Sequence, residues 1–292
     1  MKGIDVSVLQ GNIDWNKVYA DGYRFAMIKA TQGRGEGVLT QFLKRFKDEK
    51  FYKNIVGASD AGLACGVYHY FTATNVKACD DEVGYFLAII DRFKDRINLW
   101  ACVDVESKYI KGLDRDTLYM LVRRFMDKVK AAGYKPMLYT NPDFLKYRFP
   151  VGCFHNEEIW MAHWDVAKPY SMPNTRIWQY GTERVAGIKD DVDANVGYFS
   201  EAIPAVCRLA ALGVIDTPAY WLAHYKDIAY LDELIIKATA KITNKGTPFS
   251  DVKLAITRLA DCGVINTPEY WNKNAGKVKW LTELICKLGG AM

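Results

Sequence analysis

The chain of 292 residues contains no uninterrupted run of 18 apolar residues and no cluster of basic residues. A membrane-spanning helix requires about 20 consecutive apolar residues, so membrane insertion is not expected. Lysine and arginine alternate with acidic residues and the net charge is only +5, which argues against a nucleic-acid partner. The first segment reaches Asp5 before an apolar stretch forms, so no secretory signal peptide is expected. The sequence therefore predicts a product made in the cytoplasm.

The seven cysteines show no CxxC spacing, and their number is odd. This pattern argues against a disulfide framework and against a zinc site, and most of the cysteines are expected to be small buried apolar residues. Half of the residues are hydrophobic, and they include 8 Trp, 18 Tyr and 13 Phe. Such a chain buries enough apolar surface to fold, which excludes an intrinsically disordered protein.

Residues 1–198 alternate short strand-like segments with amphipathic helical segments. This order predicts an α/β fold with a mainly parallel sheet, either open or closed into a (β/α) barrel of the TIM type. The later strands follow one another too closely for a full helix between each pair, so the barrel is expected to be irregular there. Strands are expected at 3–8, 23–30, 99–106, 136–140, 159–164, 176–181 and 191–196, and helices at 76–94 and 114–131.

Three of these strands carry acidic residues opposite an aliphatic face. Residues two apart in a strand share a face. Asp5 is therefore expected opposite the aliphatic residues of the first strand, Asp104 and Glu106 opposite those of residues 99–106, and Asp193 opposite those of the last strand. In a parallel barrel these carboxylates converge inside at one end, and barrel enzymes place their active sites at the C-terminal ends of the strands.

Residues 205–237 and 255–287 form an internal repeat, in which AVCRLAALGVIDTPAYW aligns with AITRLADCGVINTPEYW. Each copy predicts a helix that ends at a glycine, a threonine cap with proline in the next turn, and a second helix. Two domains are thus expected: a catalytic domain at 1–199, and at 200–292 a small all-α domain of two helical hairpins. This smaller domain is expected to bind a polymer or to self-associate. Trp221 and Trp271 are interpreted as core residues of the hairpins.

Asp104-Val105-Glu106 is the sharpest chemical signal in the chain. Two carboxyls on one strand face lie ~7 Å apart, a spacing that reaches both sides of one glycosidic bond. Mutual repulsion raises the pKa of at least one of them, which keeps a proton available near neutral pH. A Mg²⁺ or Ca²⁺ site is the second interpretation. Neither an EF-hand spacing nor a phosphate-binding loop accompanies the acids, so we expect no metal or cofactor and full activity in EDTA.

Aromatic residues gather near the same strand ends. Their faces suit pyranose rings, which stack through C–H surfaces while their edges form hydrogen bonds. His69 and His163 alternate out of phase with these aromatic residues and are interpreted as packed or supporting side chains. The predicted substrate-binding residues are Tyr68, Tyr70, Tyr139, Trp160, Trp164 and Gln179.

Eight segments in this order resemble glycoside hydrolase family 25, the lysozyme-type N-acetylmuramidases that include many phage endolysins. The resemblance covers residues 1–198, and it implies an irregular (β/α) barrel that cleaves the β-1,4 bond from N-acetylmuramic acid to N-acetylglucosamine in bacterial peptidoglycan. The sequence differs from the family pattern at Gln32, where glutamate is common, and at residues 34–50, which resemble an insertion. The segments are IDVSVLQG (4–11), MIKATQG (27–33), AGLACGVYHYF (61–71), VDVE (103–106), MLYT (137–140), IWMAHW (159–164), IWQYG (177–181) and DVDANV (191–196).

By this resemblance Glu106 is the general acid, Asp104 its partner carboxylate, and Asp5 and Asp193 the flanking acids. Cleavage with net retention is expected, with Asp104 acting as nucleophile or orienting the 2-acetamido group of the substrate. A phage-type endolysin would be held in the host cytoplasm and act on the wall after release. Two other readings stay open: a chitinase-like barrel hydrolase, and a carbohydrate-binding or assembly protein without activity. The C-terminal repeat resembles wall-associated modules.

Overall fold

The computed structural model describes residues 1–33, 46–224, 231, 234, 238, 252–274 and 288. The chain divides into two compact units, one formed by Met1–Ala58 with Ala64–Phe199 and the other by Ser59–Leu63 with Ser200–Met292. The first part of the predicted insertion, residues 34–45, lies outside the described residues. So do most of residues 225–251 and 275–292, which include the later part of each repeat and the segment between the two copies.

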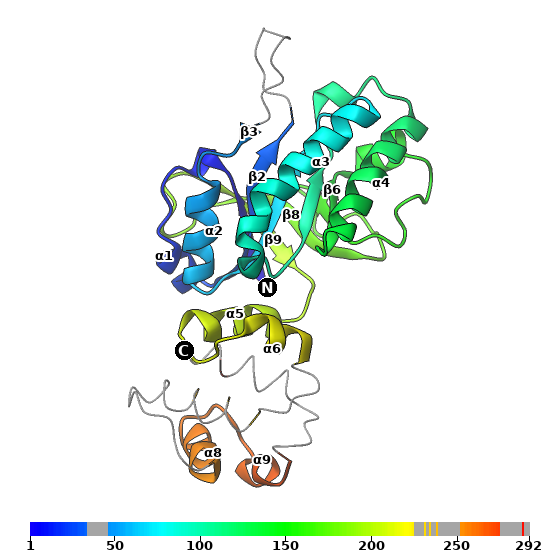
Figure 1. Ribbon diagram of the computed structural model, residues 1–292. Helices are drawn as coiled ribbons and strands as arrows, with labels where there is room; N and C mark the ends of the chain where they lie inside the picture. The colour runs from blue at the N-terminus through cyan, green and yellow to red at the C-terminus, as the bar shows by residue number, and fades with distance from the viewer. Residues whose placement is uncertain are drawn as a thin grey trace. The chain divides into compact units, whose positions relative to one another are not determined.

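Eight strands of the first unit form a closed barrel with helices around it (Figure 1). Neighbouring strands follow the order β1-β9-β8-β7-β6-β5-β4-β2, and β2 pairs with β1 to close the ring, while the short β3 (Phe46–Lys47) adds to the edge of β2. This confirms the predicted irregular α/β barrel. The strands are β1 (Lys2–Val6), β2 (Tyr23–Gln32), β4 (Ala64–Tyr70), β5 (Ala101–Asp104), β6 (Pro136–Thr140), β7 (Ile159–Ala162), β8 (Thr175–Glu183) and β9 (Val192–Gly197).

The irregularity lies in the second half of the barrel. Helices α1 (Trp15–Ala20), α2 (Phe51–Asp60), α3 (Val76–Ile90) and α4 (Arg115–Ala131) connect the earlier strands. Only a π-helical turn at Phe144–Arg148 joins β6 to β7, and the described chain has no helix between β7 and β8 or between β8 and β9. Short 3-10 turns complete the unit at Val8–Gln10, Asp91–Arg96 and Lys108–Ile110.

The helices begin where a side chain can accept a backbone N–H. Asp14, Asn75 and Asp114 cap α1, α3 and α4 in this way. One face of α4 is apolar and fully buried against the barrel and α3, and it includes Leu118, Val122 and Phe125. This layer of aliphatic and aromatic side chains covers the outside of the strands, which leaves the inner face of the barrel for polar residues.

The last strand of the barrel, β9, runs in the opposite direction to its two neighbours. Within the ring, β1, β2 and β4 to β8 pair with one another in parallel, whereas β9 is antiparallel to both β8 and β1. The first residues of β9 therefore lie at the same end of the barrel as the last residues of the other strands. In the β1–β9 ladder Asp5 pairs directly with Asp193. Reversal of one strand thus brings the two acids together at the C-terminal mouth.

The second unit contains two helix pairs of matching geometry, α5 (Ala202–Ala211) with α6 (Pro218–His224) and α8 (Val252–Asp261) with α9 (Pro268–Asn274). Gly213 and Gly263 each follow the first helix of a pair with φ of +69°, a conformation that favours glycine. The next backbone N–H, from Val214 or Val264, bonds back into the helix at 2.9 and 2.8 Å respectively. The two sequence copies therefore fold alike.

Both copies contribute to one hydrophobic core. Trp221 and Trp271 are each 6% exposed and belong to this core together with Leu209 and Leu259. The prediction that these tryptophans are structural is confirmed, because their ring faces are covered by protein. In the ranges that the structure describes, no helix is long and apolar enough to cross a membrane.

Candidate active site

Four carboxyl groups meet at the C-terminal mouth of the barrel. Asp5 lies on β1, Asp104 is the last residue of β5, and Asp193 is near the start of β9. Asp5 and Asp104 are buried, Asp193 is half-buried, and Glu106 reaches solvent. Residues far apart in the chain therefore form one acidic cluster, as the strand pattern predicts.

Glu106 lies on a loop, because β5 ends two residues before it. The prediction that both carboxyls sit within one strand needs this correction. The backbone N–H of Val105 still bonds to the Tyr139 carbonyl at 3.0 Å, which keeps the chain extended for one further residue. Ser107 then caps the 3-10 turn at Lys108–Ile110, and this cap turns the chain away from the barrel. The loop position places Glu106 at the open end of the site.

Asp5 is held by two amide side chains. The Gln179 Nε2 donates to Asp5 Oδ2 at 2.9 Å, and the Asn195 Nδ2 donates to the same oxygen at 2.8 Å. The strand pattern places Asn195 on the same face as Asp193 but does not identify it as a site residue. Its position in the β8–β9 ladder opposite Gln179 explains why both amides reach one carboxylate.

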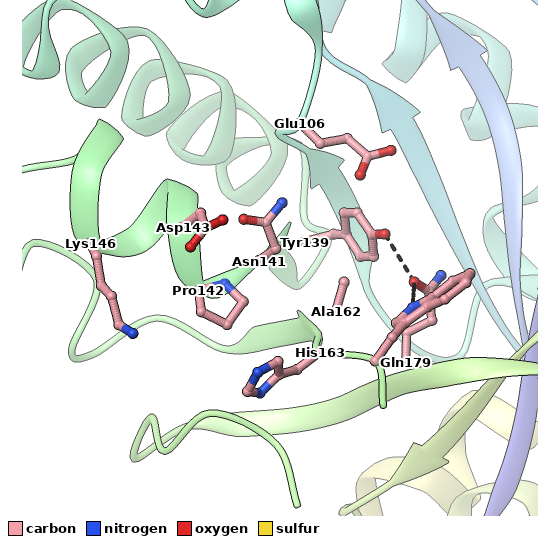
Figure 2. A pocket seen from close by; sticks show the side chains of 10 residues that line it. Glu106, Tyr139, Asn141, Pro142, Asp143, Lys146, Ala162, His163 and Gln179 are labelled. Carbon is pink, nitrogen blue, oxygen red and sulfur yellow. Dashed lines mark hydrogen bonds between the residues drawn. The ribbon is translucent and has the colours of Figure 1, made fainter. Parts of the chain in front are cut away.

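Aromatic donors fix these two amides in turn. The Trp160 indole N–H donates to Asn195 Oδ1 at 2.8 Å. Tyr139 and Trp164 both donate to Gln179 Oε1, at 3.1 and 2.9 Å (Figure 2). Because each amide oxygen accepts a hydrogen bond, each amide nitrogen is oriented toward Asp5. The result is a continuous hydrogen-bonded network beneath the acids.

The pKa values of all four carboxyl groups are raised above those of ordinary carboxylic acids. Burial and repulsion from Asp193 raise the pKa of Asp5 to about 8, although its two amide donors lower it. Burial and repulsion from Glu106 raise the pKa of Asp104 well above its usual value. The pKa values of Glu106 and Asp193 are also raised by removal of water. Although Glu106 reaches solvent, the protein atoms around the concave mouth remove part of its hydration, and this loss of water raises its pKa.

Lys29 is a site residue that sequence reasoning missed. It is half-buried on β2, and its Nζ donates to Gln32 Oε1 at 2.8 Å and lies 5.2 Å from the Tyr70 ring centroid. Its positive charge lowers the pKa values of both Asp104 and Glu106. The signal was present, because Lys29 interrupts the apolar strand in MIKATQG with a charge at an inward position. One ammonium group therefore offsets part of the charge of the acids.

The predicted aromatic residues occupy different depths. Trp160 is 1% exposed, so its ring has no access to a sugar, and it supports Asn195 instead. Tyr139 packs edge-on against Trp160 at 4.6 Å and Tyr68 does so at 5.8 Å. Both tyrosines are largely buried, and Tyr70 is half-buried beside Lys29. Trp164 is 44% exposed and is the ring best placed to meet a ligand.

A pocket of about 470 Å³ opens beside the acids and is of a size that holds sugar residues. Figure 2 shows Glu106 and Tyr139 on one side of it and the residues that follow β6 and β7 on the other. Among the predicted residues, it brings together Glu106, Tyr139, Trp164 and Gln179. It is lined by Glu106, Tyr139, Asn141, Pro142, Asp143, Lys146, Ala162, His163, Trp164 and Gln179.

The two histidines have different positions. His69 is fully buried, with Nε2 3.0 Å from Glu82 Oε2 and Nδ1 2.7 Å from Thr31 Oγ1, which agrees with a packed role. His163 lines the pocket, and its Nδ1 is buried without a hydrogen-bond partner in the described structure. Across the described residues, no group of three or more His, Cys, Asp or Glu side chains is arranged to hold a metal ion.

A barrel mouth that gathers four carboxyl groups of raised pKa, next to a pocket with an exposed indole, is typical of a glycoside hydrolase. Comparison with known proteins agrees with this class, because the family model described as Glycosyl hydrolases family 25 matches residues 4–188. The chain belongs to this family.

Two curated relatives and one solved structure illustrate the similarity. Lysozyme M1 from Streptomyces globisporus is 30% identical over 209 residues, which cover 67% of this chain and 67% of that protein. The autolytic lysozyme of Clostridium acetobutylicum is 31% identical over 204 residues, covering 70% of this chain and 57% of that protein. The bacterial lysozyme structure from Streptomyces coelicolor has a TM-score of 0.57 and 27% identity, covering 68% of this chain and 92% of the other.

Proposed function

We propose that this hydrolase is a muramidase that cleaves the β-1,4 bond between N-acetylmuramic acid and N-acetylglucosamine in peptidoglycan. The observation that carries the proposal is the convergence of four carboxyl groups at the barrel mouth, those of Asp5, Asp104, Glu106 and Asp193. Of these four residues, Glu106 is the one that lines the adjacent pocket. Similarity to proteins named lysozyme and N,O-diacetylmuramidase supports the substrate class.

In this proposal Glu106 is the acid and base of the reaction. Burial raises the pKa of Glu106, which favours its protonated form, and this carboxyl gives its proton to the glycosidic oxygen as the bond to the muramic carbon breaks. The resulting carboxylate then takes a proton from the water that attacks the anomeric carbon. Because the first displacement and the attack by water each invert the carbon, the product retains its configuration.

Two routes to the first displacement fit the position of Asp104. Its Oδ1 is buried and has no hydrogen-bond partner in the described structure, so this oxygen is free to meet a substrate atom. It either attacks the anomeric carbon or accepts the N–H of the 2-acetamido group, whose carbonyl oxygen then attacks. Substrates whose acetamido group carries one, two or three fluorine atoms separate these routes. Rates fall steeply with fluorination only when the acetamido oxygen is the nucleophile.

The deciding experiment is digestion of purified peptidoglycan from several Gram-positive species, followed by mass spectrometry of the fragments. We expect muropeptides that end in reducing N-acetylmuramic acid, and their loss in Glu106→Gln. Asp95→Asn is the matched control, because Asp95 is an exposed carboxylate on the turn that precedes β5 and does not line the pocket. Reducing N-acetylglucosamine ends, or cleavage of chitin alone, would refute the muramidase assignment. Proton NMR of fresh product tests retention.

The endolysin role and the ligand of the second unit remain predictions. If the protein is an endolysin, cells that produce it in the cytoplasm stay intact until their membrane is permeabilised, and they lyse within minutes afterwards. If residues 205–287 bind the wall, the inactive Glu106→Gln protein sediments with purified walls, and substitutions confined to the second unit abolish this binding. If these residues self-associate instead, the full chain shows a concentration-dependent mass in light scattering.

A further inference from the structure

The pocket beside Glu106 carries a positive charge away from the acids. Asn141, Asp143 and Lys146 follow β6, and Figure 2 shows Lys146 on the side of the pocket opposite Glu106. Lys146 belongs to the π-helical turn that joins β6 to β7, and its side chain is exposed. The acidic mouth and this lysine thus form two ends of one cavity.

The surroundings of Lys146 leave its ammonium group available to a ligand. Its Nζ lies 4.8 Å from the ring centroid of Tyr170, a cation–π contact that orients the side chain without neutralising it. Asp143 lines the same pocket, and within the described residues no ion pair joins it to Lys146. Lys146 is therefore a charged donor at the pocket edge.

The walls between these two ends suit a substituted sugar. Pro142, Ala162 and the exposed Trp164 supply apolar surface. The Asn141 side-chain oxygen accepts from the Phe144 N–H at 3.0 Å, which leaves its amide nitrogen as the group that can donate to a ligand. Away from Glu106 the pocket therefore offers apolar contact, the amide donor of Asn141 and the cation of Lys146, together with the carboxylate of Asp143.

A substrate that carries carboxylates on its sugars would be repelled by the four acids of the mouth. Its own carboxylates are best accommodated where the site presents a cation, and in this pocket that residue is Lys146. Muramic acid bears such a group: its 3-O-lactyl arm ends in a carboxyl, which is either free or joined through an amide bond to a peptide with carboxylates of its own.

We propose that Lys146 and Asn141 form a subsite for the carboxylate-bearing substituent of the muramic residue, and that this subsite makes the enzyme prefer muramic polymers over unsubstituted N-acetylglucosamine polymers. This inference rests on the proposed muramidase function. Lys146 acts on specificity and takes no part in bond cleavage. An ion pair at a partly exposed site contributes modestly, so removal of the ammonium group is expected to lower kcat/KM roughly three- to tenfold.

The test compares Lys146→Met with Lys146→Arg, which keeps the charge. Lys94→Met is the matched control, because Lys94 is also exposed and lies 5.1 Å from a tyrosine ring, that of Tyr134, before the start of β5. Each full-length variant is assayed on intact peptidoglycan, on strands freed of peptide by an amidase, and on those strands after coupling of the lactyl carboxyl to methylamine.

We expect Lys146→Met to lose activity on the carboxylate-bearing substrates and to match the wild type on the methylamide strands, with Lys146→Arg and Lys94→Met near the wild type throughout. A defect confined to peptide-free strands assigns the lactyl carboxylate, and one confined to intact peptidoglycan assigns a peptide carboxylate. Equal activity of Lys146→Met and wild type on all three substrates, or equal loss on all three, overturns the subsite.

Failure of the proposed function gives a different result. If the wild type cleaves none of the three substrates, calorimetric binding of the peptide-free strands to Glu106→Gln, with and without Lys146→Met, still tests the subsite. Weaker binding in the double variant supports it, and unchanged binding refutes it.

Discussion

Replacement of Lys29 by methionine should shift the whole pH profile of the enzyme to higher pH. Lys29 is the half-buried cation whose charge lowers the pKa values of Asp104 and Glu106. A nearby positive charge favours the ionised form of a carboxyl, so its removal raises both pKa values. In the proposed mechanism the pair of carboxyls must hold one proton, so both limbs of the profile move in the alkaline direction when both pKa values rise.

The size of the shift follows from Coulomb's law. Two unit charges ~6 Å apart interact by about 3 kcal/mol at an effective dielectric constant near 20, which corresponds to roughly two pKa units. Since Lys29 is only half-buried, screening by solvent and salt reduces this to about one unit. Methionine keeps the length and apolar character of the side chain, so the barrel is expected to stay folded.

The assay is the pH dependence of kcat/KM on a soluble peptide-free glycan, with Lys29→Arg as the charge-conserving control. We expect the arginine variant to keep the wild-type profile and the methionine variant to move both limbs by about one pH unit. Loss of activity with both limbs in place would refute the electrostatic argument and assign Lys29 a direct contact with substrate. High salt should reduce the difference between the two variants.

Asp5→Asn should inactivate the enzyme and stabilise it at pH 7 to 8 by about 1–2 kcal/mol. The pKa of Asp5 is about 8 in the folded protein and near 4 in the unfolded chain, so the wild type loses stability as the pH rises between these two values, whereas the asparagine variant does not. Its melting temperature should exceed that of the wild type at pH 8 and match it at pH 4, and equal values at both would contradict this. Trp160→Phe should lower kcat with little change in KM and cost about 1–3 kcal/mol, since it leaves Asn195 Oδ1 buried without a donor. Urea unfolding together with steady-state kinetics tests it, and a change in KM alone would argue against a supporting role. Leu259→Ala should destabilise the second unit by about 2–5 kcal/mol while hydrolysis of soluble fragments continues, as calorimetry and a fragment assay would show. Loss of both together would contradict it.

The inward orientation of the acidic side chains was predictable, because the alternation of faces along a strand depends only on local sequence. Asp104 and Asp5 alternate with valine and isoleucine, so any strand at these positions must present them on one face. The reversed direction of β9 was not predictable in this way, since alternation reads the same from either end. It is this reversal that places Asp193 directly beside Asp5.

The supporting residues required three-dimensional information. Trp160 looks like a sugar-binding ring in sequence, and only its 1% exposure and its bond to Asn195 show a structural role. The role of Lys29 was not predictable from sequence, because a single lysine in a strand is also typical of a solvent-exposed edge. Its meaning depends on closure of the barrel around it, which brings β2 to the acids of β5.

The pairing of the first and last strands makes the acidic cluster depend on the completion of the barrel. Asp5 and Asn195, which donates a hydrogen bond to it, lie 190 residues apart in the chain. A nascent or truncated chain that ends before β9 lacks Asp193 and Asn195, and it leaves β1 and β8 as open edges. The acidic cluster at the mouth is therefore assembled only when the two ends of the barrel have met.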